Sequence, residues 1–264
     1  MRVVAVYNIK GGVGKTATAV NLAYLSAAAG TRTLLWDLDP QGSATYYFRV
    51  RSGIDGSLKK LVRGKRRLDK LALETDYEGL DLLPSDFSYR NLDIELKSAG
   101  KSKRRLGRLL GPLADRYDHV YLDCSPSISL VSEGVFAAAD SLLVPTIPTT
   151  LSLRTLDQLA RHLGDKGVTH PEVLPFYCMV DRRKSLHREI VASKDSRPYG
   201  FLRATIPYSS TVEKMGVHRA PVAVYAAGSA ADMAYRELWT EALSRSGSWL
   251  GWAAARWRSS LFGS

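Results

Sequence analysis

A glycine-rich segment near the start of the chain carries residue types that bind a phosphate chain. Residues 10–16 read Lys-Gly-Gly-Val-Gly-Lys-Thr. Glycines let the backbone curve around an anion with its N–H groups turned inward, and a following helix adds the positive end of its dipole. In such a loop, Lys15 reaches the β- and γ-phosphates and the Thr16 hydroxyl ligates Mg²⁺. The segment therefore predicts a site for ATP and magnesium.

The loop departs from the general phosphate-loop pattern, which is Gly, four residues, then Gly-Lys-Ser/Thr. Ile9 stands where that pattern has its first glycine, and Lys10 adds a second lysine. The flanking sequence argues against an ordinary glycine-rich turn. The apolar run Val3–Tyr7 predicts a buried strand before the loop, and apolar residues at helical spacing over 19–27 predict a helix after it.

Three aspartates follow two short apolar runs. Asp37 and Asp39 come after Thr33–Trp36, and Asp123 follows His119–Leu122. The carboxyl ends of parallel strands form the edge where doubly wound sheets bind ligands, so we expect these acids near the phosphate loop. Strand alternation would send Asp37 and Asp39 to the same side, provided the strand continues that far. One carboxylate would then belong to the Mg²⁺ shell and another would orient the attacking water, although such acids alone would indicate only solvated turns.

These segments together resemble a known family. Residues 10–16, with the extra Lys10, are similar to the deviant Walker A loop of the ParA/MinD ATPases, and Asp-Leu-Asp-Pro-Gln-Gly at 37–42 is similar to the Soj-like ParA branch. The resemblance implies an α/β fold in which a doubly wound, mostly parallel sheet carries helices on both faces. It also implies ATP hydrolysis to ADP and phosphate by a homodimer that closes on ATP, with Lys10 reaching the partner's nucleotide.

The resemblance assigns roles residue by residue. It makes Lys10 and Asp39 the catalytic residues. The metal ligands that it implies are Thr16, Asp37 and Asp123. The nucleotide contacts that it implies are Lys10, Gly11, Gly12, Val13, Gly14, Lys15, Thr16, Ala17 and Pro207, the last through backbone groups that close over adenine. Ala17 stands where the family often has a second threonine, and Thr18 is the nearest hydroxyl.

The charge balance indicates an anionic partner. Lys and Arg number 37 against 26 Asp and Glu, a formal net charge of +11. Such a balance is typical of proteins that bind nucleic acid or an anionic membrane, unless the chain is simply a basic soluble protein. The resemblance implies non-specific contacts to DNA phosphates from the C-terminal part, with Lys194, Arg197, Arg203, Lys214, Arg219 and Arg236 as candidates. Two more basic runs, 59–67 and 101–108, are interpreted as solvated faces, although the second also has the spacing of a phosphate-binding stripe.

We expect an ATPase domain over residues 1–245 and a Trp- and Arg-rich tail over 246–264. The tail has the composition of an interfacial amphipathic helix, and docking on protein is an equal alternative. No apolar run is long enough to span a bilayer, and the N-terminus enters a strand without room for a signal peptide. Two cysteines give no disulfide framework, so we expect a cytoplasmic, nucleoid-associated protein.

The resulting hypothesis is a ParA-type ATPase whose ATP-bound dimer holds non-specific DNA. A ParB-like or cargo adaptor protein would stimulate hydrolysis and so position a plasmid, a chromosome or a protein body such as a carboxysome. Two alternatives stay open. One is a MinD-like, membrane-associated positioning ATPase. The other is an amidoligase of the cobyrinic acid diamide synthase type, which shares the phosphate loop but needs a glutamine-derived ammonia source, for which we expect no room in the chain.

Overall fold

A mostly parallel sheet forms the centre of the protein in the computed structural model, which describes residues 1–53, 58–98, 105–165, 171–196 and 200–245. The described strands form one sheet of eight in the order β3-β4-β2-β5-β1-β6-β7-β8. Their bounds are β1 Arg2–Val6, β2 Thr33–Asp37, β3 Leu73–Glu74, β4 Leu80–Leu83, β5 His119–Asp123, β6 Ser141–Thr146, β7 Glu172–Val180 and β8 Thr205–Pro207. Only β3, a short strand on one edge, pairs antiparallel to its neighbour among these strands.

Strand alternation divides the core into two layers. In and directly after β1, Val3, Ala5 and Tyr7 pack on one face of the sheet, and Val4 and Val6 pack on the other. Both sets are buried, because helices cover both faces, and this accounts for the nearly continuous apolar sequence of the central strands.

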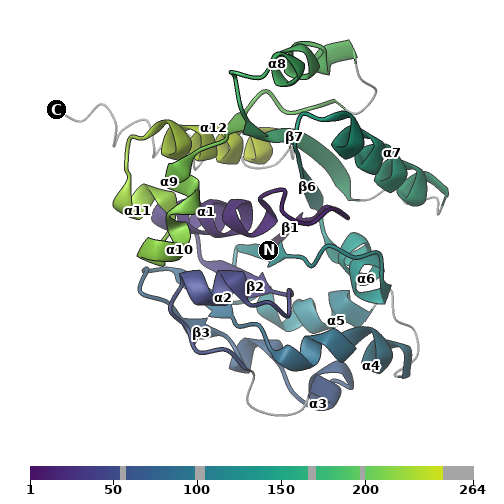
Figure 1. Cartoon of the computed structure of the whole chain (residues 1–264). Helices are drawn as coiled ribbons and strands as arrows, with labels where there is room; N and C mark the ends of the chain where they lie inside the picture. Colours follow the sequence, from purple (N-terminus) through teal and green to yellow (C-terminus); the bar gives the residue numbers. More distant parts are fainter. Residues whose placement is uncertain (54–57, 99–104, 166–170, 197–199, 246–264) are drawn as a thin grey trace.

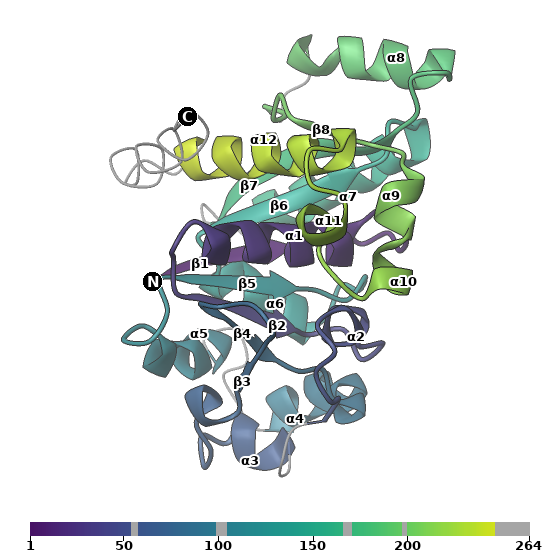
Figure 2. The ribbon, with the colours of Figure 1, turned by 90° about the vertical axis from the view of Figure 1, so that its left-hand side faces the viewer.

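Helices cover both faces of the sheet, as Figure 1 shows. One face carries α1 Lys15–Ala28, α2 Ser43–Tyr47, α9 Ser210–Glu213, α10 Met215–His218, α11 Val222–Tyr225 and α12 Ala230–Arg245. The other carries α3 Leu58–Val62, α4 Leu92–Ser98, α5 Arg105–Leu110, α6 Leu130–Ala138, α7 Thr150–Asp165 and α8 Ser185–Ala192. Figure 2 shows α1 and α12 side by side. The predicted doubly wound architecture is confirmed.

Short 3₁₀ turns join some of these elements: η1 Leu68–Lys70, η2 Phe87–Asn91, η4 Gly111–Leu113 and η5 Lys194–Ser196. The helical path changes at Gly111-Pro112, where α5 ends at Leu110 and the chain continues as η4. Among the helices of the described ranges, none is both long and apolar enough to cross a bilayer. The tail, residues 246–264, lies outside the described residues.

The strand register brings the ends of the central strands together. Asp37 on β2 is the register partner of Asp123 on β5, and Asp123 is in turn opposite Val6 at the end of β1. The phosphate loop leaves β1 directly after this point. Segments far apart in sequence therefore meet at one edge of the sheet.

Candidate nucleotide-binding site

The phosphate loop joins β1 to α1, and two of its glycines have backbone conformations that disfavour a side chain. The φ angle is +68° at Gly12 and +91° at Gly14, which is the N-cap of α1. A Cβ added to Gly14 would lie 2.8 Å from Sγ of Cys178 on β7. Glycine therefore lets the loop pass this close to the sheet, and it leaves the first N–H groups of α1 available to an anion.

Lys15 and Lys10 meet at this loop. Nζ of Lys15 donates to the carbonyl oxygen of Lys10 at 3.1 Å. Burial lowers the pKa of Lys15, and the charges of Asp123 and Asp39 oppose that shift, so both acids lie near the ammonium group. Nζ of Lys10 donates to Oγ of Ser152 at the start of α7, at 3.3 Å. In a single subunit Lys10 is thus held by its own chain, and its reach to a partner's nucleotide stays a prediction.

Asp37 is fully buried at the end of β2 and is held by the first turn of α2. Its Oδ2 accepts hydrogen bonds from N and Oγ1 of Thr45 at 2.8 and 2.7 Å. Burial raises the pKa of Asp37 to about 6, the hydrogen bonds from Thr45 limit the rise, and the charge of Asp39 adds to it. The charged form of Asp37 would therefore gain from a nearby cation.

Asp123 is the neighbouring acid on β5 and is also fully buried. Among the described residues, neither of its carboxylate oxygens has a hydrogen-bond partner. Burial, and then the charge of Asp37, raise the pKa of Asp123 well above its usual value, while the nearby hydroxyl of Thr16 acts against the rise. Buried polar groups are nearly always paired, so this carboxylate indicates a ligand that completes the site.

Asp39 lies in a turn rather than in a strand. β2 ends at Asp37, so the strand alternation considered for the two acids does not extend to Asp39. Its Oδ1 instead accepts from N of Gln41 at 3.0 Å, and its side chain is half-buried. The charge of Asp39 contributes to the raised pKa values of both Asp37 and Asp123, so the turn still keeps it close to them. A carboxylate partly open to solvent suits the predicted role of orienting a water.

The other two predicted contacts have different surroundings. Ala17 packs against the core beneath α1, and Thr18 is fully buried beside Tyr235 of α12. The hydroxyl of Thr18 therefore does not take the place of the second threonine that the family often has at position 17. Pro207 ends β8 opposite Val180 of β7, at the same edge of the sheet as the phosphate loop. Its contact with adenine stays a prediction.

A magnesium ion fits the chemistry of this donor set. Within the described ranges, no three His, Cys, Asp or Glu side chains gather so that they could hold a metal ion by themselves. Mg²⁺ usually keeps several waters and binds one or two carboxylates together with phosphate oxygens. Thr16, Asp37 and Asp123 match that requirement, and the unpaired buried oxygens of Asp123 are the observation that supports it.

Comparison with known proteins identifies the family of the chain. A family model described as an AAA domain matches residues 1–167. The chromosome partitioning protein ParA of Caulobacter vibrioides is 33% identical over 258 residues, covering 93% of this chain and 95% of that protein. The chain belongs to the ParA/MinD family. Its members are P-loop NTPases, so the predicted family and fold class are both confirmed.

Two solved structures extend the comparison with the ParA/MinD family. One is cobyrinic acid a,c-diamide synthase from Mycobacterium smegmatis with bound ATP analog and magnesium. It is 28% identical, with a TM-score of 0.79 over 94% of this chain and 96% of that one. The other is an ATP complex of a McdA variant from Cyanothece, which is 21% identical with a TM-score of 0.79 over 92% and 96% of the two chains. At that identity, McdA shows the fold alone.

Three residues that shape this ParA/MinD-family site were not predicted from the sequence. Thr45 holds Asp37, Ser152 holds Lys10, and Cys178 sets the space beside Gly14. Each is a single small side chain on a different element, without a motif around it. The register and packing of the sheet bring these three residues to the site, so their spacing along the sequence could not predict their positions.

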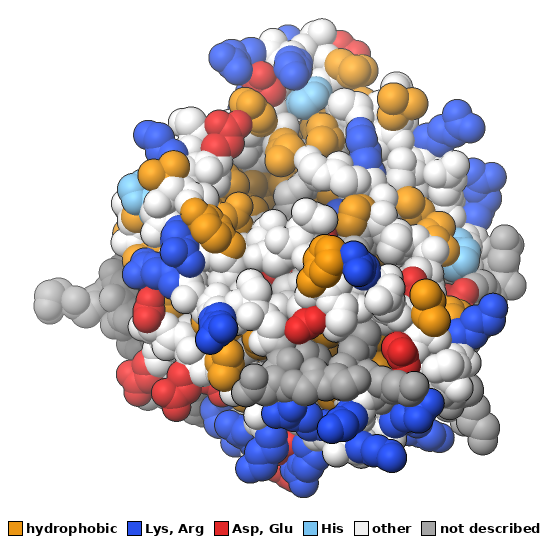
Figure 3. All heavy atoms as spheres, turned by 60° about the horizontal axis from the view of Figure 1, so that its bottom comes forward, with side chains coloured by type: hydrophobic (Ala, Val, Ile, Leu, Met, Phe, Trp, Pro, Cys, Tyr) orange, Lys and Arg blue, Asp and Glu red, His pale blue; other side chains and the backbone are white. Residues whose placement is uncertain are grey.

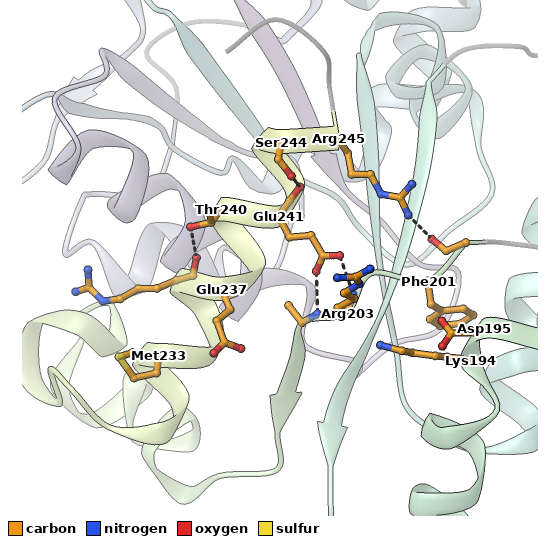
Figure 4. Close-up of a pocket in the computed structure, with 13 residues that line it drawn as sticks. Lys194, Asp195, Phe201, Arg203, Met233, Glu237, Thr240, Glu241, Ser244 and Arg245 are labelled. Carbon is orange, nitrogen blue, oxygen red and sulfur yellow. Dashed lines mark hydrogen bonds between the residues drawn. The ribbon is translucent and has the colours of Figure 1, made fainter. Parts of the chain in front are cut away.

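Three of the predicted DNA contacts of this family member lie near β8 and α12. Lys194, Arg203 and Arg236 line a cavity of about 910 Å³ between the segment before β8 and α12. Figure 4 shows this cavity with Glu241 beside Arg203; its carboxylate accepts from the backbone N–H groups of Arg203 and Ala204 at 2.9 and 2.8 Å.

The basic candidates differ in the groups that surround them. The guanidinium of Arg236 pairs with Asp232 at 2.9 Å. Arg219 lies over the ring of Tyr46 and donates to its carbonyl oxygen. Lys214 is exposed at the end of α9, and Arg197 lies outside the described residues. DNA contact by any of these side chains stays a prediction.

Proposed function

We propose that this chain is a ParA-type ATPase that positions a cargo on DNA. The observation that carries the proposal is Asp123, buried beside Asp37 and Lys15, without a hydrogen-bond partner among the described residues. A triphosphate with its cation would satisfy these groups, and the 33% identical protein of Caulobacter vibrioides is a chromosome partitioning protein. The cargo of this chain would be a plasmid, a chromosome or a protein body.

The proposed reaction is hydrolysis of ATP to ADP and phosphate. A water, oriented by Asp39, attacks the γ-phosphorus, and the bond to the bridging oxygen of ADP breaks. Lys15 and the amides of the loop neutralise the oxygens on which charge collects. Bound Mg²⁺ would neutralise charge on the β- and γ-phosphates, with Thr16, Asp37 and Asp123 as its direct or water-mediated ligands.

An ATP-dependent homodimer belongs to the same proposal, with Lys10 supplied across the interface. Large apolar side chains are exposed within a few residues of the site: Tyr46 at 51%, Ile128 at 48%, Leu151 at 67% and Tyr208 at 55%. Exposed apolar groups around a binding site are typical of a surface that becomes covered by a partner. A second copy meeting this edge of the sheet would cover them.

The proposed partners are non-specific DNA and a ParB-like or cargo adaptor protein that stimulates hydrolysis. The net charge of +11 supports DNA binding, and we propose a cytoplasmic, nucleoid-associated location. The domain of residues 1–245 would carry these activities. The tail of residues 246–264 would distinguish this proposal from a MinD-like, membrane-associated one. Flotation with liposomes in place of ATP-dependent DNA binding would favour the MinD-like function.

The nucleotide site is tested by Lys15→Ala, with Lys97→Ala as a matched control. Both variants lose one positive charge, but Lys97 is exposed on α4. We expect Lys15→Ala to lose ATP binding in a calorimetric titration and Lys97→Ala to bind as the wild type does. Equal affinities for ATP in the two variants would overturn the proposed site.

A second candidate function is ATP-dependent amide formation, because a 28% identical structure is a cobyrinic acid a,c-diamide synthase. That reaction consumes an acceptor carboxylate together with ammonia or glutamine. Turnover of ATP that rises with DNA and ignores glutamine supports the positioning ATPase. Turnover that requires glutamine or ammonia and yields an amide would favour the second candidate.

A further inference from the structure

Two basic runs that are far apart in the sequence lie together on the surface. Nε of Arg105, at the start of α5, donates to the carbonyl oxygen of Val62 at the end of α3. A guanidinium nitrogen of Arg116, just after η4, donates to the carbonyl oxygen of Asp69 in η1. Residues 60–70 and 105–116 therefore form one continuous surface, which we call the basic surface.

The basic surface has a large excess of positive charge. Its two segments contain nine Lys and Arg against two Asp, in a chain whose whole formal charge is +11. In Figure 3, Lys and Arg side chains gather along the lower border of the molecule, at the end that carries α3. Most of the net positive charge of the chain therefore comes from these two segments, as is typical of proteins that bind a polyanion.

Few of these charges are neutralised from within the protein. Arg67 pairs with Asp69 at 2.9 Å, and Arg116 approaches Asp81 at 3.9 Å. No acidic side chain among the described residues lies within 4.0 Å of the other exposed cations of the surface, which are Lys60, Arg63, Lys65, Lys70 and Arg108. These five exposed side chains thus extend into solvent from a packed support.

The support is the apolar side of the same segments. The buried side chains are Leu61, Val62, Leu68, Leu106, Leu109, Leu110 and Leu113, and each is at most 8% exposed. Within these two described segments, no large apolar side chain is exposed. Protein interfaces use buried aromatic or aliphatic anchors, and membrane-surface helices use an apolar face. A positively charged surface without apolar anchors is instead suited to binding a phosphate backbone.

The C-terminal cavity differs in this respect. Its basic residues, Lys194, Arg203, Arg236 and Arg245, share the lining with Asp195, Glu237 and Glu241. Arg236 is already paired with Asp232. A polyanion placed there would meet nearly as many negative as positive groups.

We propose that the basic surface, rather than the C-terminal candidates, holds the phosphate backbone of duplex DNA. The proposal rests on the DNA binding of the proposed function and names where it occurs. The basic surface lies at the β3–β4 end of the sheet, whereas β8 forms the opposite end. None of its residues belongs to the nucleotide site, so changes on the basic surface should leave ATP binding intact.

The test compares two triple variants that remove equal charge. One is Arg63→Gln/Lys65→Gln/Arg108→Gln on the basic surface, and the other is Lys194→Gln/Arg203→Gln/Lys214→Gln in the C-terminal part. Fluorescence anisotropy with a labelled duplex of arbitrary sequence is measured in ATP and in ADP over a series of salt concentrations. ATP affinity is measured in parallel. We expect the first variant to weaken DNA binding on the order of tenfold or more and to lower the salt slope by about 3, since each lost phosphate contact contributes about 1.

The alternative outcomes are distinct. If the C-terminal variant loses DNA binding while the basic-surface variant keeps it, the proposed location is wrong although the proposed function stands. The location is equally wrong if both variants bind as the wild type does, or if the first variant loses only binding to anionic phospholipid vesicles. Wild-type protein that ignores DNA in both nucleotides would remove the DNA-binding part of the proposed function itself.

Discussion

At Gly14 the phosphate loop runs so close to β7 that a side chain has no room. The 2.8 Å approach of a Cβ to Sγ of Cys178 adds to the cost of a φ angle of +91°. Gly12 also has positive φ but has no atom within 4 Å of an added Cβ. The thiol of Cys178 is buried, and burial raises the pKa of Cys178 to about 12, so it acts here as a neutral packing group.

We predict that Gly14→Ala destabilises the protein more than Gly12→Ala does. Both replacements carry the penalty of positive φ, about 1–2 kcal/mol, and the overpacking at Gly14 adds about 1–3 kcal/mol. The free energy of unfolding from urea titration measures the difference. Adding Cys178→Ala to Gly14→Ala should recover the overpacking part only. Equal costs at the two glycines, or no recovery in the double variant, would contradict this account.

Residue types in the sequence indicate the charged groups of the candidate site, but not the residues that hold those groups in place. The structure brings Lys15, Asp37 and Asp123 together, because a phosphate loop and acids at strand ends share one edge of a parallel sheet. The position of Asp39 in a turn was not predictable from alternation, since that requires knowing where β2 ends. Thr45 could not be identified from spacing, because its hydrogen bonds to Asp37 depend on how α2 packs.

At the scale of elements, the start of α7 determines where Lys10 points in one subunit. Ser152 accepts from Nζ of Lys10 and is itself linked to Thr149, whose hydroxyl donates to Oγ of Ser152 at 3.0 Å. The loop also depends on Asn8, whose Oδ1 accepts from N of Lys10 and whose Nδ2 donates to the carbonyl oxygen of Pro145. To reach a partner's nucleotide, Lys10 has to leave Ser152, while Asn8 keeps the backbone of the loop in place.

We predict that Lys10→Ala and Asp39→Ala are each inactive but complement one another when mixed. In a mixed dimer, the Asp39→Ala subunit supplies Lys10 to a partner site that retains Asp39. The mixture should show about a quarter of the wild-type ATP turnover, because half of the dimers are mixed and each has one complete site. Phosphate release with duplex DNA present measures the rate.

The control for this prediction is Ser152→Ala, which removes only the contact of Lys10 within its own chain. It should keep both ATP binding and turnover. A mixture of the two inactive variants that stays inactive, although each binds ATP, would show that Lys10 does not act across the interface.

At the scale of the whole molecule, the ends of the sheet serve different purposes. The carboxyl ends of the strands carry the candidate nucleotide site, and the β3–β4 end of the sheet carries the basic surface. His119 begins β5 at the amino ends, where its Nδ1 lies 2.6 Å from Oγ of Ser26 on α1. Only 1% of the side chain is exposed, so its protonation state is coupled to the packing of α1 on the sheet.

We predict that His119 makes folding stability fall as the pH is lowered. Burial, aided by the charge of Arg2, lowers the pKa of His119 to about 4, although Asp118 acts in the opposite direction. A depressed pKa means that the folded state holds the neutral ring. The contribution is therefore complete above the unfolded pKa, near 6.5, and is lost as the pH falls toward 4. The loss should reach about 3 kcal/mol.

Urea unfolding of the wild type and of His119→Gln at several pH values between 7 and 4.5 isolates this effect. Other groups, including Asp37 with its raised pKa, are common to both proteins and cancel in the difference. The wild type should lose stability more steeply than the variant below pH 6.5, because only in the wild type does unfolding release a buried ring that then takes up a proton. Parallel curves would mean that the ring already accepts a proton in the folded state, and that α1 tolerates a charge at the amino ends of the strands.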